Sequence, residues 1–536
     1  MKNKLLALLG FILLSTALAS TAQQFGGFNY TSDGLRITIT GYYGSGGAVT
    51  IPATIAGRPV TTIGSQAFFN KYSLTSVTLP ASITSIRSAA FAACVRLTAI
   101  IVNAPNPFYS SADGILFNAD RTTLIQCPGG KAGSYVIPST VTSIGNSAFS
   151  GCTSLTNVTI PGSVTNLGSG SFASCTGLIA INVDPANVSY SSLDGVLFNA
   201  DRTTLLQCPI GKAGTYAVPG SVTNLGSGAF AYCTSLTNVT IPGSVASIGS
   251  YAFSYCANLI SVTMLSGVTS IGDGAFYNCA SLTSFTMLNG VTSIGDSAFY
   301  NCTSLTSATI PGSVASIGSS AFIYCANLTN VAMLNGVASI GYRAFFECTS
   351  LTSVTIPGSI TSMGDSAFYN CSSLTSVTMS DGVTSIGNDA FDYCTSLINI
   401  TIPGSVTIIG YDAFYNCTNL TGVFFKGNAP SGGGLFNGNS PTVYYLPGAT
   451  GWGATFAGEP TRLWNPLMQS SGVGPAGFGF NITGTEDIPI VIEAATSLAN
   501  GNWAPLQTLN LTNGAFHFTD PNWTNCSVRF YRIRSP

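Results

Sequence analysis

The chain of 536 residues is long enough for three or four ordinary domains, or for one long repeat array with caps. Only 7% of its residues are charged, 46% are hydrophobic, and 17 basic against 19 acidic residues give a net charge of -2. This composition excludes a disordered chain, and it argues against nucleic-acid binding because no basic patch is present to neutralise phosphates. The single histidine, His517, argues against a multi-histidine metal site and a His-relayed triad.

Residues 1–22 have the pattern of a secretory signal peptide. Two lysines precede an apolar run from Leu5 to Ala19, and small residues follow it. We expect cleavage after Ala19 or Ala22, and therefore a protein that is secreted or displayed on the cell surface. An uncleaved N-terminal anchor is the alternative. The apolar run is short for a membrane span and no later stretch is long enough, so we expect no transmembrane span in the mature chain.

Internal repetition dominates the chain after this segment. A representative unit, CTSLTNVTIPGSVTNLGSGSF, runs from Cys152 to Phe172 and returns with a period of 23 residues. The cysteines in this register are Cys233, Cys256, Cys279, Cys302, Cys325, Cys348, Cys371, Cys394 and Cys417. The phenylalanines in register are Phe68, Phe91, Phe149, Phe172, Phe230, Phe253, Phe276, Phe299, Phe322, Phe345, Phe368, Phe391 and Phe414. Such a fixed period predicts a solenoid, in which stacked units share a core that no single unit has.

The apolar positions within one unit predict its local structure. Leu155, Val158 and Ile160 form an L-x-x-V-x-I pattern, which is typical of a short strand that enters a turn. Three residues before each Phe, eleven of thirteen side chains are Ser, Asp or Asn. We expect them to cap a short helical or 3₁₀ turn that begins at the following Ala-Phe pair. Capping then explains the acidic residues at this position better than paired catalytic carboxylates or a cation ladder.

The cysteine column allows two interpretations. Disulfides are common in exported proteins, and neighbouring coils would hold their Cα atoms about 4.8 Å apart, within the range of a disulfide. Side chains that point the same way in register keep their Cβ atoms too far apart, so a ladder of buried thiols is favoured. Zinc binding is disfavoured because the column lacks the C-x-x-C spacing of zinc sites.

Two longer copies, DGILFNADRTTLIQCP from Asp113 and DGVLFNADRTTLLQCP from Asp194, are inserted between regular units. Their charged residues, which are candidates for a paired cation or ligand site, are Asp113, Asp120, Arg121, Asp194, Asp201 and Arg202. The favoured interpretation is structural, since Asn-Ala-Asp between apolar strands is typical of a hairpin turn.

After Trp464 the period stops, and alternating segments such as GFGFNITG and PIVIEAATS predict a small all-β module. Attachment to the envelope, recognition by an export machine, and sugar binding through Trp503 and Trp523 are its candidate functions. The favoured interpretation places those two rings in the module's own core, because large aromatic side chains dominate small cores.

The unit from Cys348 to Phe368, CTSLTSVTIPGSITSMGDSAF, resembles the BspA-like leucine-rich-repeat family of bacterial surface and secreted proteins. The opening segment from Phe28 and the closing PTVYYLPGATGWGATF from Pro441 are also similar to that family. The resemblance implies a β-rich, right-handed leucine-rich-repeat superhelix of 23-residue coils with short helical or 3₁₀ turns, which displays a ligand surface. It implies adhesion to host or matrix proteins, as for some members, and no catalytic residue.

The expected organisation of the chain has five parts. They are a signal peptide at 1–22, capping coils at 23–62, a solenoid at 63–425 with inserts at about 103–135 and 184–216, a C-terminal cap at 426–465, and a small all-β module at 466–536.

Strand alternation predicts the binding surface, because residues between inward positions point outward. The predicted ligand-binding residues are Asn238, Thr240, Ser261, Thr263, Ser284, Thr286, Ser307, Thr309, Ser353, Thr355, Ser376, Thr378, Asn399 and Thr401. We expect this nearly uncharged platform to bind an extracellular protein or glycan, with no cofactor and no metal. The alternative is that these residues are ordinary solvent-exposed strand residues without a binding role. A substrate-presenting part of a carbohydrate-active system and a structural surface-layer component also remain open as functions.

Overall fold

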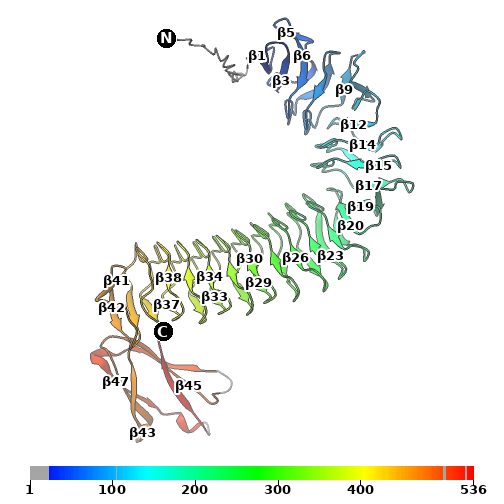
Figure 1. Cartoon of the computed structure of the whole chain (residues 1–536). Coiled ribbons are helices and arrows are strands. Elements are labelled where there is room, and N and C mark those ends of the chain that lie inside the picture. The colour runs from blue at the N-terminus through cyan, green and yellow to red at the C-terminus, as the bar shows by residue number, and fades with distance from the viewer. Residues whose placement is uncertain (1–22, 104, 499–501, 526–527) are drawn as a thin grey trace, which may run out of the picture. The chain divides into compact units, whose positions relative to one another are not determined.

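A computed structural model describes residues 23–103, 105–498, 502–525 and 528–536 of the chain. The predicted signal peptide, residues 1–22, lies outside the described residues. The chain divides into two compact units after Ser191, and each is described by itself. In both, short strands alternate with turns and loops (Figure 1). Among the described residues, no helix has the length and apolar character that a membrane crossing requires.

The first unit contains four sheets. The largest comprises β1 (Gln23–Phe25), β2 (Phe28–Ser32), β3 (Ile37–Tyr42), β5 (Thr54–Ile55), β6 (Arg58–Ile63) and β8 (Ser85–Ile86). The second comprises β4 (Gly47–Thr50), β7 (Leu74–Leu79) and β9 (Ala99–Val102). The third comprises β10 (Tyr109–Ala112), β11 (Ile115–Asn118), β12 (Thr123–Gln126), β14 (Ser143–Ile144) and β16 (Asn166–Leu167). The fourth comprises β13 (Gly133–Val136), β15 (Leu155–Ile160) and β17 (Ala180–Val183), and β18 (Tyr190–Leu193) spans the boundary between the units.

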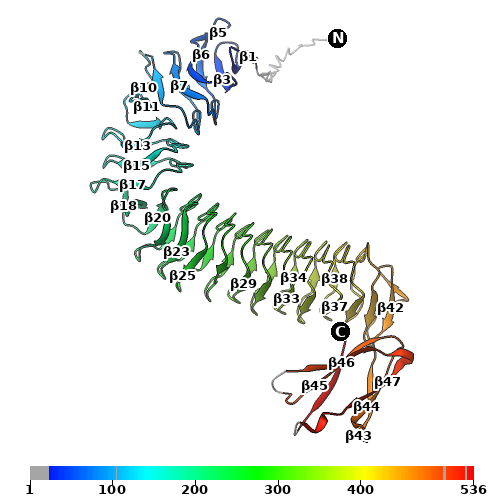
Figure 2. The same ribbon diagram turned by 180° about the vertical axis from the view of Figure 1, so that it is seen from behind.

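The second unit continues as a regular stack of coils, each with one longer and one shorter strand (Figure 2). The shorter strands pair in one sheet and are β19 (Val196–Asn199), β20 (Thr204–Gln207), β22 (Asn224–Leu225), β24 (Ser247–Ile248), β26 (Ser270–Ile271), β28 (Ser293–Ile294), β30 (Ser316–Ile317), β32 (Ser339–Ile340), β34 (Ser362–Met363), β36 (Ser385–Ile386) and β38 (Ile408–Ile409).

The longer strands form three successive sheets. The first contains β21 (Gly214–Ala217), β23 (Leu236–Ile241), β25 (Ser261–Met264) and β27 (Ser284–Phe285). The next contains β29 (Ser307–Ile310), β31 (Asn330–Met333), β33 (Ser353–Ile356) and β35 (Ser376–Met379). The last contains β37 (Asn399–Ile402), β39 (Gly422–Phe425), β40 (Thr442–Tyr445), β41 (Thr455–Phe456) and β42 (Glu459–Leu463). Parallel pairing of Val239 with Val262, 23 residues on, confirms the predicted coil length.

The core of the second unit is a column of stacked phenylalanine rings. Phe253 and Phe276 lie 5.1 Å apart with 2° between their planes, and Phe322 and Phe345 lie 5.2 Å apart with 5°. All four rings are fully buried. The cysteine column lies beside them, and the thiol of Cys348 donates a hydrogen bond of 3.2 Å to the carbonyl oxygen of Phe322 in the preceding coil. Each coil is therefore closed by its neighbours, as the solenoid prediction requires.

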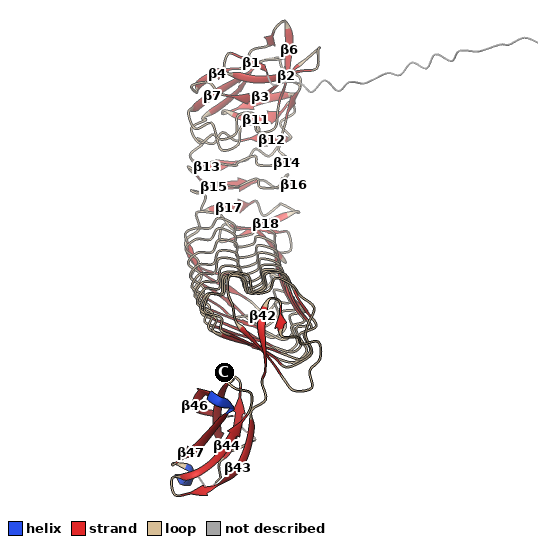
Figure 3. Ribbon diagram, turned by 90° about the vertical axis from the view of Figure 1, so that its left-hand side faces the viewer, coloured by secondary structure: helices blue, strands red, loops and turns tan. Residues whose placement is uncertain are grey.

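The turn segment that carries each core Phe differs from the expectation. It is a run of turns, and in the described part of the chain the only helices are η1 (Thr512–Gly514) and η2 (Trp523–Asn525) in the C-terminal module (Figure 3). Where the residue three positions before the Phe is Asn or Asp, its side chain accepts a backbone hydrogen bond from the next coil, as Asp273 Oδ1 does from Asp296 N at 2.9 Å. Where it is Ser, the hydroxyl can donate to the next coil instead, as Ser227 Oγ does to the carbonyl oxygen of Ser250 at 3.0 Å. The prediction that this side chain caps its own turn is therefore wrong. These residues join coil to coil because parallel stacking brings the next N–H within reach.

The C-terminal module is a pair of three-stranded antiparallel sheets, so the prediction of an all-β module is confirmed. One sheet contains β43 (Leu467–Gly474), β44 (Gly477–Thr483) and β47 (Ala515–Asp520), and the other contains β45 (Pro489–Ala495), β46 (Ala504–Asn510) and β48 (Phe530–Arg534). Phe480, Ile490 and Phe518 are buried between them. Trp503 and Trp523 are only half-buried and stand outside this buried cluster, so their predicted place in the core is wrong.

Candidate functional site

The outward side of the longer strands in the second unit carries the predicted ligand-binding residues, and we call it the strand face. In-register pairing places Asn238 beside Ser261, and it places Thr355 beside Thr378. Nine of the fourteen predicted side chains are exposed and five are half-buried. They alternate along each strand with inward-pointing side chains, which are mostly Val, Ile and Met and are buried. The nine exposed ones are Thr263, Ser284, Thr286, Ser307, Thr309, Ser353, Thr355, Ser376 and Thr378, and the five half-buried ones are Asn238, Thr240, Ser261, Asn399 and Thr401.

Most hydroxyls of the strand face are available to a ligand. At one end Ser261 Oγ donates to Asn238 Oδ1 over 2.7 Å. Within the described residues, the exposed hydroxyls from Ser284 to Thr378 form no hydrogen bond with the protein. A partner that supplies donors and acceptors can therefore bind them without breaking bonds inside the fold.

The strand face is not one continuous sheet. Strand β27 is cut to two residues, and Thr286 lies just beyond its end. Phe285 fills the inward position that Val262 has in the preceding coil, and its ring lies 4.9 Å from Phe276 and 4.8 Å from Phe299. The next coil compensates with the small Ala308. One further row, Asn330 with Ala332, belongs to the face and was missed by the sequence analysis, because Ala interrupts the hydroxyl column.

A cavity of about 770 Å³ lies at the C-terminal end of the strand face. Four of the predicted residues line it, namely Ser376, Thr378, Asn399 and Thr401. The opposite wall is the end of the chain, from Ile533 to Pro536. Binding cavities for small groups combine apolar walls with a few placed polar groups, and this one has both.

Aromatic residues form the third side of the cavity. Phe424 follows Thr401 in the outward column, and Tyr444 follows Phe424. Their rings stack 4.6 Å apart, and both are buried against the C-terminal module. Trp464, which also lines the cavity, donates from Nε1 to the carbonyl oxygen of Pro489 at 2.9 Å. The outward column thus changes from hydroxyls to aromatic rings where the module covers it.

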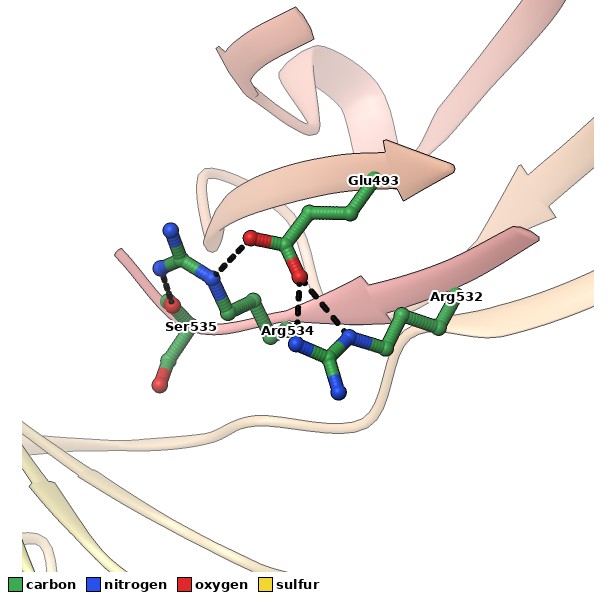
Figure 4. A network of polar contacts seen from close by, with 4 residues as sticks. All are labelled: Glu493, Arg532, Arg534 and Ser535. Atoms are coloured by element: carbon green, nitrogen blue, oxygen red, sulfur yellow. Dashed lines mark hydrogen bonds and ion pairs between the residues drawn. The ribbon is translucent and has the colours of Figure 1, made fainter. Parts of the chain in front are cut away.

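The chain end is held in place by an ion-pair network (Figure 4). Glu493 Oε2 accepts from Arg532 Nε at 2.7 Å, and Glu493 Oε1 accepts from Arg534 Nε at 2.6 Å. Burial opposes ionisation of this carboxyl, but the hydrogen bonds from Arg534 and Arg532 outweigh it and lower its pKa. Arg534 also donates to the carbonyl oxygen of Ser535 at 2.7 Å, which fixes the residues that wall the cavity.

The cysteine column is buried in the described part of the chain. All fourteen described cysteines are free and buried, which confirms the thiol ladder, and Cys526 lies outside the described residues. Burial raises the pKa of Cys279 and of Cys325 to about 12. A raised pKa favours the protonated thiol, which is a weaker nucleophile and metal ligand than the thiolate. In the described part of the chain, no group of three or more His, Cys, Asp or Glu residues could hold a metal ion.

The two inserted copies fold as hairpins, so the turn interpretation is confirmed. Strands β11 and β12 are antiparallel, and Asn118 Oδ1 accepts from Thr123 N at 2.8 Å across the turn. In the second copy, Asp201 Oδ1 accepts from the backbone N and the hydroxyl of Thr203 at 3.0 and 2.6 Å. The Asp201 carboxylate is thus used to shape a turn.

Comparisons with known proteins concern the repeats. The family model described as "BspA type Leucine rich repeat region" matches residues 48–130, 129–200, 212–329 and 315–440. Among solved structures, the chain is similar to a leucine rich cell surface protein from Faecalibacterium prausnitzii, with 29% identity, 58% of this chain and 94% of that chain covered, and a TM-score of 0.39. It is also similar to a leucine-rich repeat protein from Bacteroides ovatus, with 24% identity, 83% and 100% covered, and a TM-score of 0.46. No curated protein matches the chain.

Proposed function

Because the chain belongs to the family of BspA-type leucine-rich-repeat proteins, we propose that it is an exported, non-enzymatic protein that binds an extracellular protein or glycan through the strand face. The family model confirms the resemblance seen in the sequence. Membership of this surface-protein family supports a protein-binding or adhesion role. The proposal assigns no catalytic residue and no cofactor.

The observation that carries the proposal is the cavity at the end of the strand face. Its floor continues the open hydroxyl and amide columns, and its aromatic and C-terminal walls are fixed by packing and ion pairs. An extended ligand on the face can therefore place one end in the cavity, where it loses water contacts on several sides. Desolvated contacts of this kind carry most of the affinity of an interface.

The test is binding of the purified chain to an array of glycans and extracellular-matrix proteins. A variant with Ser376→Lys and Thr378→Lys changes two cavity-lining side chains that are exposed and form no internal hydrogen bond. We expect its affinity for the strongest array ligand to fall at least tenfold. The control is Asn157→Lys with Thr159→Lys, two half-buried outward residues on β15 of the first unit, of which Asn157 donates to Ser134 Oγ at 3.2 Å. It should bind within twofold of wild type. Equal binding by all three proteins would contradict the proposal.

Export is tested separately. The apolar run from Leu5 to Ala19 supports the proposed signal peptide. Sequencing the N-terminus of the protein recovered from the cell surface or the medium should give a chain that starts after Ala19 or Ala22. A chain that keeps Met1 and stays inside the cell would contradict export.

A further inference from the structure

A ladder of aromatic rings runs along the turn segments of the second unit. We call it the aromatic ladder, and its nine members are Tyr232, Tyr255, Tyr277, Tyr300, Tyr324, Phe346, Tyr369, Tyr393 and Tyr415. Neighbouring ring centroids lie between 4.5 and 6.1 Å apart. Each ring comes either one or two residues after the core Phe of its coil. Every coil from Phe230 to Phe414 has such a ring, but in some coils it is one residue after the core Phe and in others two. No single position of the repeat therefore shows the ladder.

The coil fold does not require this ladder. In three coils of the first unit the same two positions hold Ala92–Ala93, Ser150–Gly151 and Ala173–Ser174. Their core is formed in the same way, since Phe149 and Phe172 stack 5.1 Å apart. The rings are also costly to expose: Tyr232 is 49% exposed, and Tyr255 is 39% exposed. Four of the nine rings are exposed and the other five are half-buried. A row of surface aromatic rings of this length is typical of an interaction site.

Acidic residues share this edge of the solenoid. Residues 220–424 hold eight acidic side chains and one basic side chain, Arg343. Seven of the eight lie between three residues before and two residues after a core Phe, and they are Asp273, Asp296, Glu347, Asp365, Asp389, Asp392 and Asp412. The aromatic ladder therefore lies along a strip of negative potential, which attracts cationic partners.

The one cation of this stretch already uses a ladder ring. The guanidinium of Arg343 lies 4.9 Å from the ring centroid of Phe346 and 4.9 Å from that of Tyr342. Guanidinium groups are favoured over aromatic rings because the group is planar, weakly hydrated and attracted by the ring quadrupole. The chain thus shows on its own surface how an arginine side chain fits the edge.

One oxygen of a buried carboxyl group in the same strip lacks a hydrogen-bond partner. Asp392 stands at the first position after core Phe391, where Tyr369 stands in the preceding coil, and it is 6% exposed. Within the described residues, its Oδ1 atom has no hydrogen-bond partner. A buried acceptor without a partner is costly, and a donor from outside the chain would relieve that cost.

We propose that this edge, formed by the aromatic ladder and its seven acidic residues, docks an extended arginine- and lysine-rich segment of a partner protein. Arginine side chains contact ring faces as Arg343 does, and carboxylates and tyrosine hydroxyl oxygens accept their hydrogen bonds. The edge is separate from the strand face, so this proposal does not depend on the proposed function.

A neutral glycan fits the edge less well. Tyr277 and Tyr300 lie 4.5 Å apart with 5° between their planes, and Phe346 and Tyr369 lie 4.6 Å apart with 5°. Rings stacked in this way cover each other's faces, whereas a sugar ring stacks on an open face. The concentration of carboxylates gives a neutral sugar no advantage and gives a cation a large one.

The experiment measures binding of the full chain to a labelled 12-residue peptide of alternating Arg and Gly, by fluorescence anisotropy at low and physiological salt. We expect binding that weakens as salt rises, because exposed charges are screened. A variant with Tyr232, Tyr255, Tyr324 and Tyr393 each changed to Ser should bind at least tenfold more weakly. Serine suits these positions, since Ser174 holds the equivalent place with a φ of 56°, close to the 63° of Tyr232.

Three controls make the result decisive. Tyr43→Ser with Tyr72→Ser removes two exposed tyrosines of the first unit and should leave binding unchanged. Asp365→Asn with Asp412→Asn tests the charges without touching a ring and should flatten the salt dependence. The same peptide with Lys in place of Arg should bind wild type more weakly than the Arg peptide. Absence of peptide binding at low salt, equal binding by the four-tyrosine variant, or binding of a neutral chito-oligosaccharide in place of the peptide would each overturn the proposal.

Discussion

The coils around Phe149 and Phe172 in the first unit and those around Phe230 to Phe414 in the second share one interior but differ in their exteriors. Stacked phenylalanines and thiols that donate to the carbonyl oxygen of a core Phe occur in both. The first unit exposes Ile101 and Val136 in its outward strand columns, where the second exposes Ser and Thr. Only the second carries nine consecutive ladder rings. The repeat thus specifies the core everywhere, while regular exposed columns are confined to one unit.

The largest effects should fall on the shared core. Phe322→Ala in the second unit and Phe149→Ala in the first each remove a fully buried, stacked ring. We expect each to lower the free energy of unfolding by about 3–5 kcal/mol, because the cavity cannot be filled by neighbours fixed in register. Denaturant unfolding of the full chain measures both. A decrease in the free energy of unfolding below about 1 kcal/mol for either variant would contradict a core common to both units.

Removing one thiol of the cysteine column should lower the free energy of unfolding by the same amount in both units, and by less than removing a core Phe ring. Cys325→Ala and Cys175→Ala each remove a thiol that donates to a Phe carbonyl oxygen, at 3.2 and 3.0 Å. We expect a loss of about 1–2 kcal/mol each from the small cavity and the unpaired carbonyl. Alkylation of the native chain should leave the column unmodified, and unfolding without reductant should expose it fully. Thiols that stay unreactive after unfolding would indicate disulfides and contradict the ladder.

A pH effect from a carboxyl beside the core Phe should be confined to the second unit, since the first has no carboxylate directly after core Phe149 or Phe172. Burial raises the pKa of Asp392 from 3.8 to about 7, and the charge of Asp389 acts in the same direction. The folded state therefore holds this proton more tightly than the unfolded state. The stability that Asp392 contributes is therefore greatest at low pH and is lost as pH rises from about 4 to about 7.

Asp392→Asn should remove that dependence. We expect a gain of about 1 kcal/mol at pH 8, because one pKa unit corresponds to about 1.4 kcal/mol and the buried amide keeps part of the burial cost. At pH 4 the variant and wild type should melt at the same temperature. Thermal unfolding across this range is the measurement, and a constant difference at all pH values would contradict the assignment to Asp392.

The smallest effect should come from the aromatic ladder. Tyr277→Ser removes one half-buried stacking partner of Tyr300, and we expect a loss of about 0.5–1.5 kcal/mol in the free energy of unfolding. A loss as large as that of Phe322→Ala would show that the ladder is part of the core. The difference between the two units would then lie in their stability rather than in their binding surfaces.

The sequence was sufficient to predict features that repeat at a fixed position. The 23-residue period predicted the Phe and Cys columns and the outward strand columns, because in-register stacking turns a sequence position into a spatial column. The period did not predict the contacts that join one coil to the next. The Oδ1 atom of Asp273 bonds to the next coil, and a single unit contains no sign of that partner. The ladder alternates between two positions, so it escapes a search for fixed columns.

Burial by the C-terminal module was also missed, although a signal existed. Phe424 and Tyr444 occupy outward positions that earlier coils give to Thr, and large apolar side chains there indicate a covered surface. The size of Phe285 at an inward position likewise marks the interruption of the strand face. Packing outcomes of this kind depend on side-chain volumes in three neighbouring coils, which a one-unit pattern does not include.

A lysine scan of the outward threonines tests the central claim most directly, which is that binding belongs to the regular columns of the second unit. Thr309→Lys and Thr355→Lys are placed on the strand face, and Thr78→Lys and Thr159→Lys are placed on equivalent strands of the first unit. Affinity of each single variant is measured for the strongest ligand found on the array. The account predicts at least a tenfold loss for the first pair and a change within twofold for the second. Equal losses in both units, or no loss in either, would contradict it.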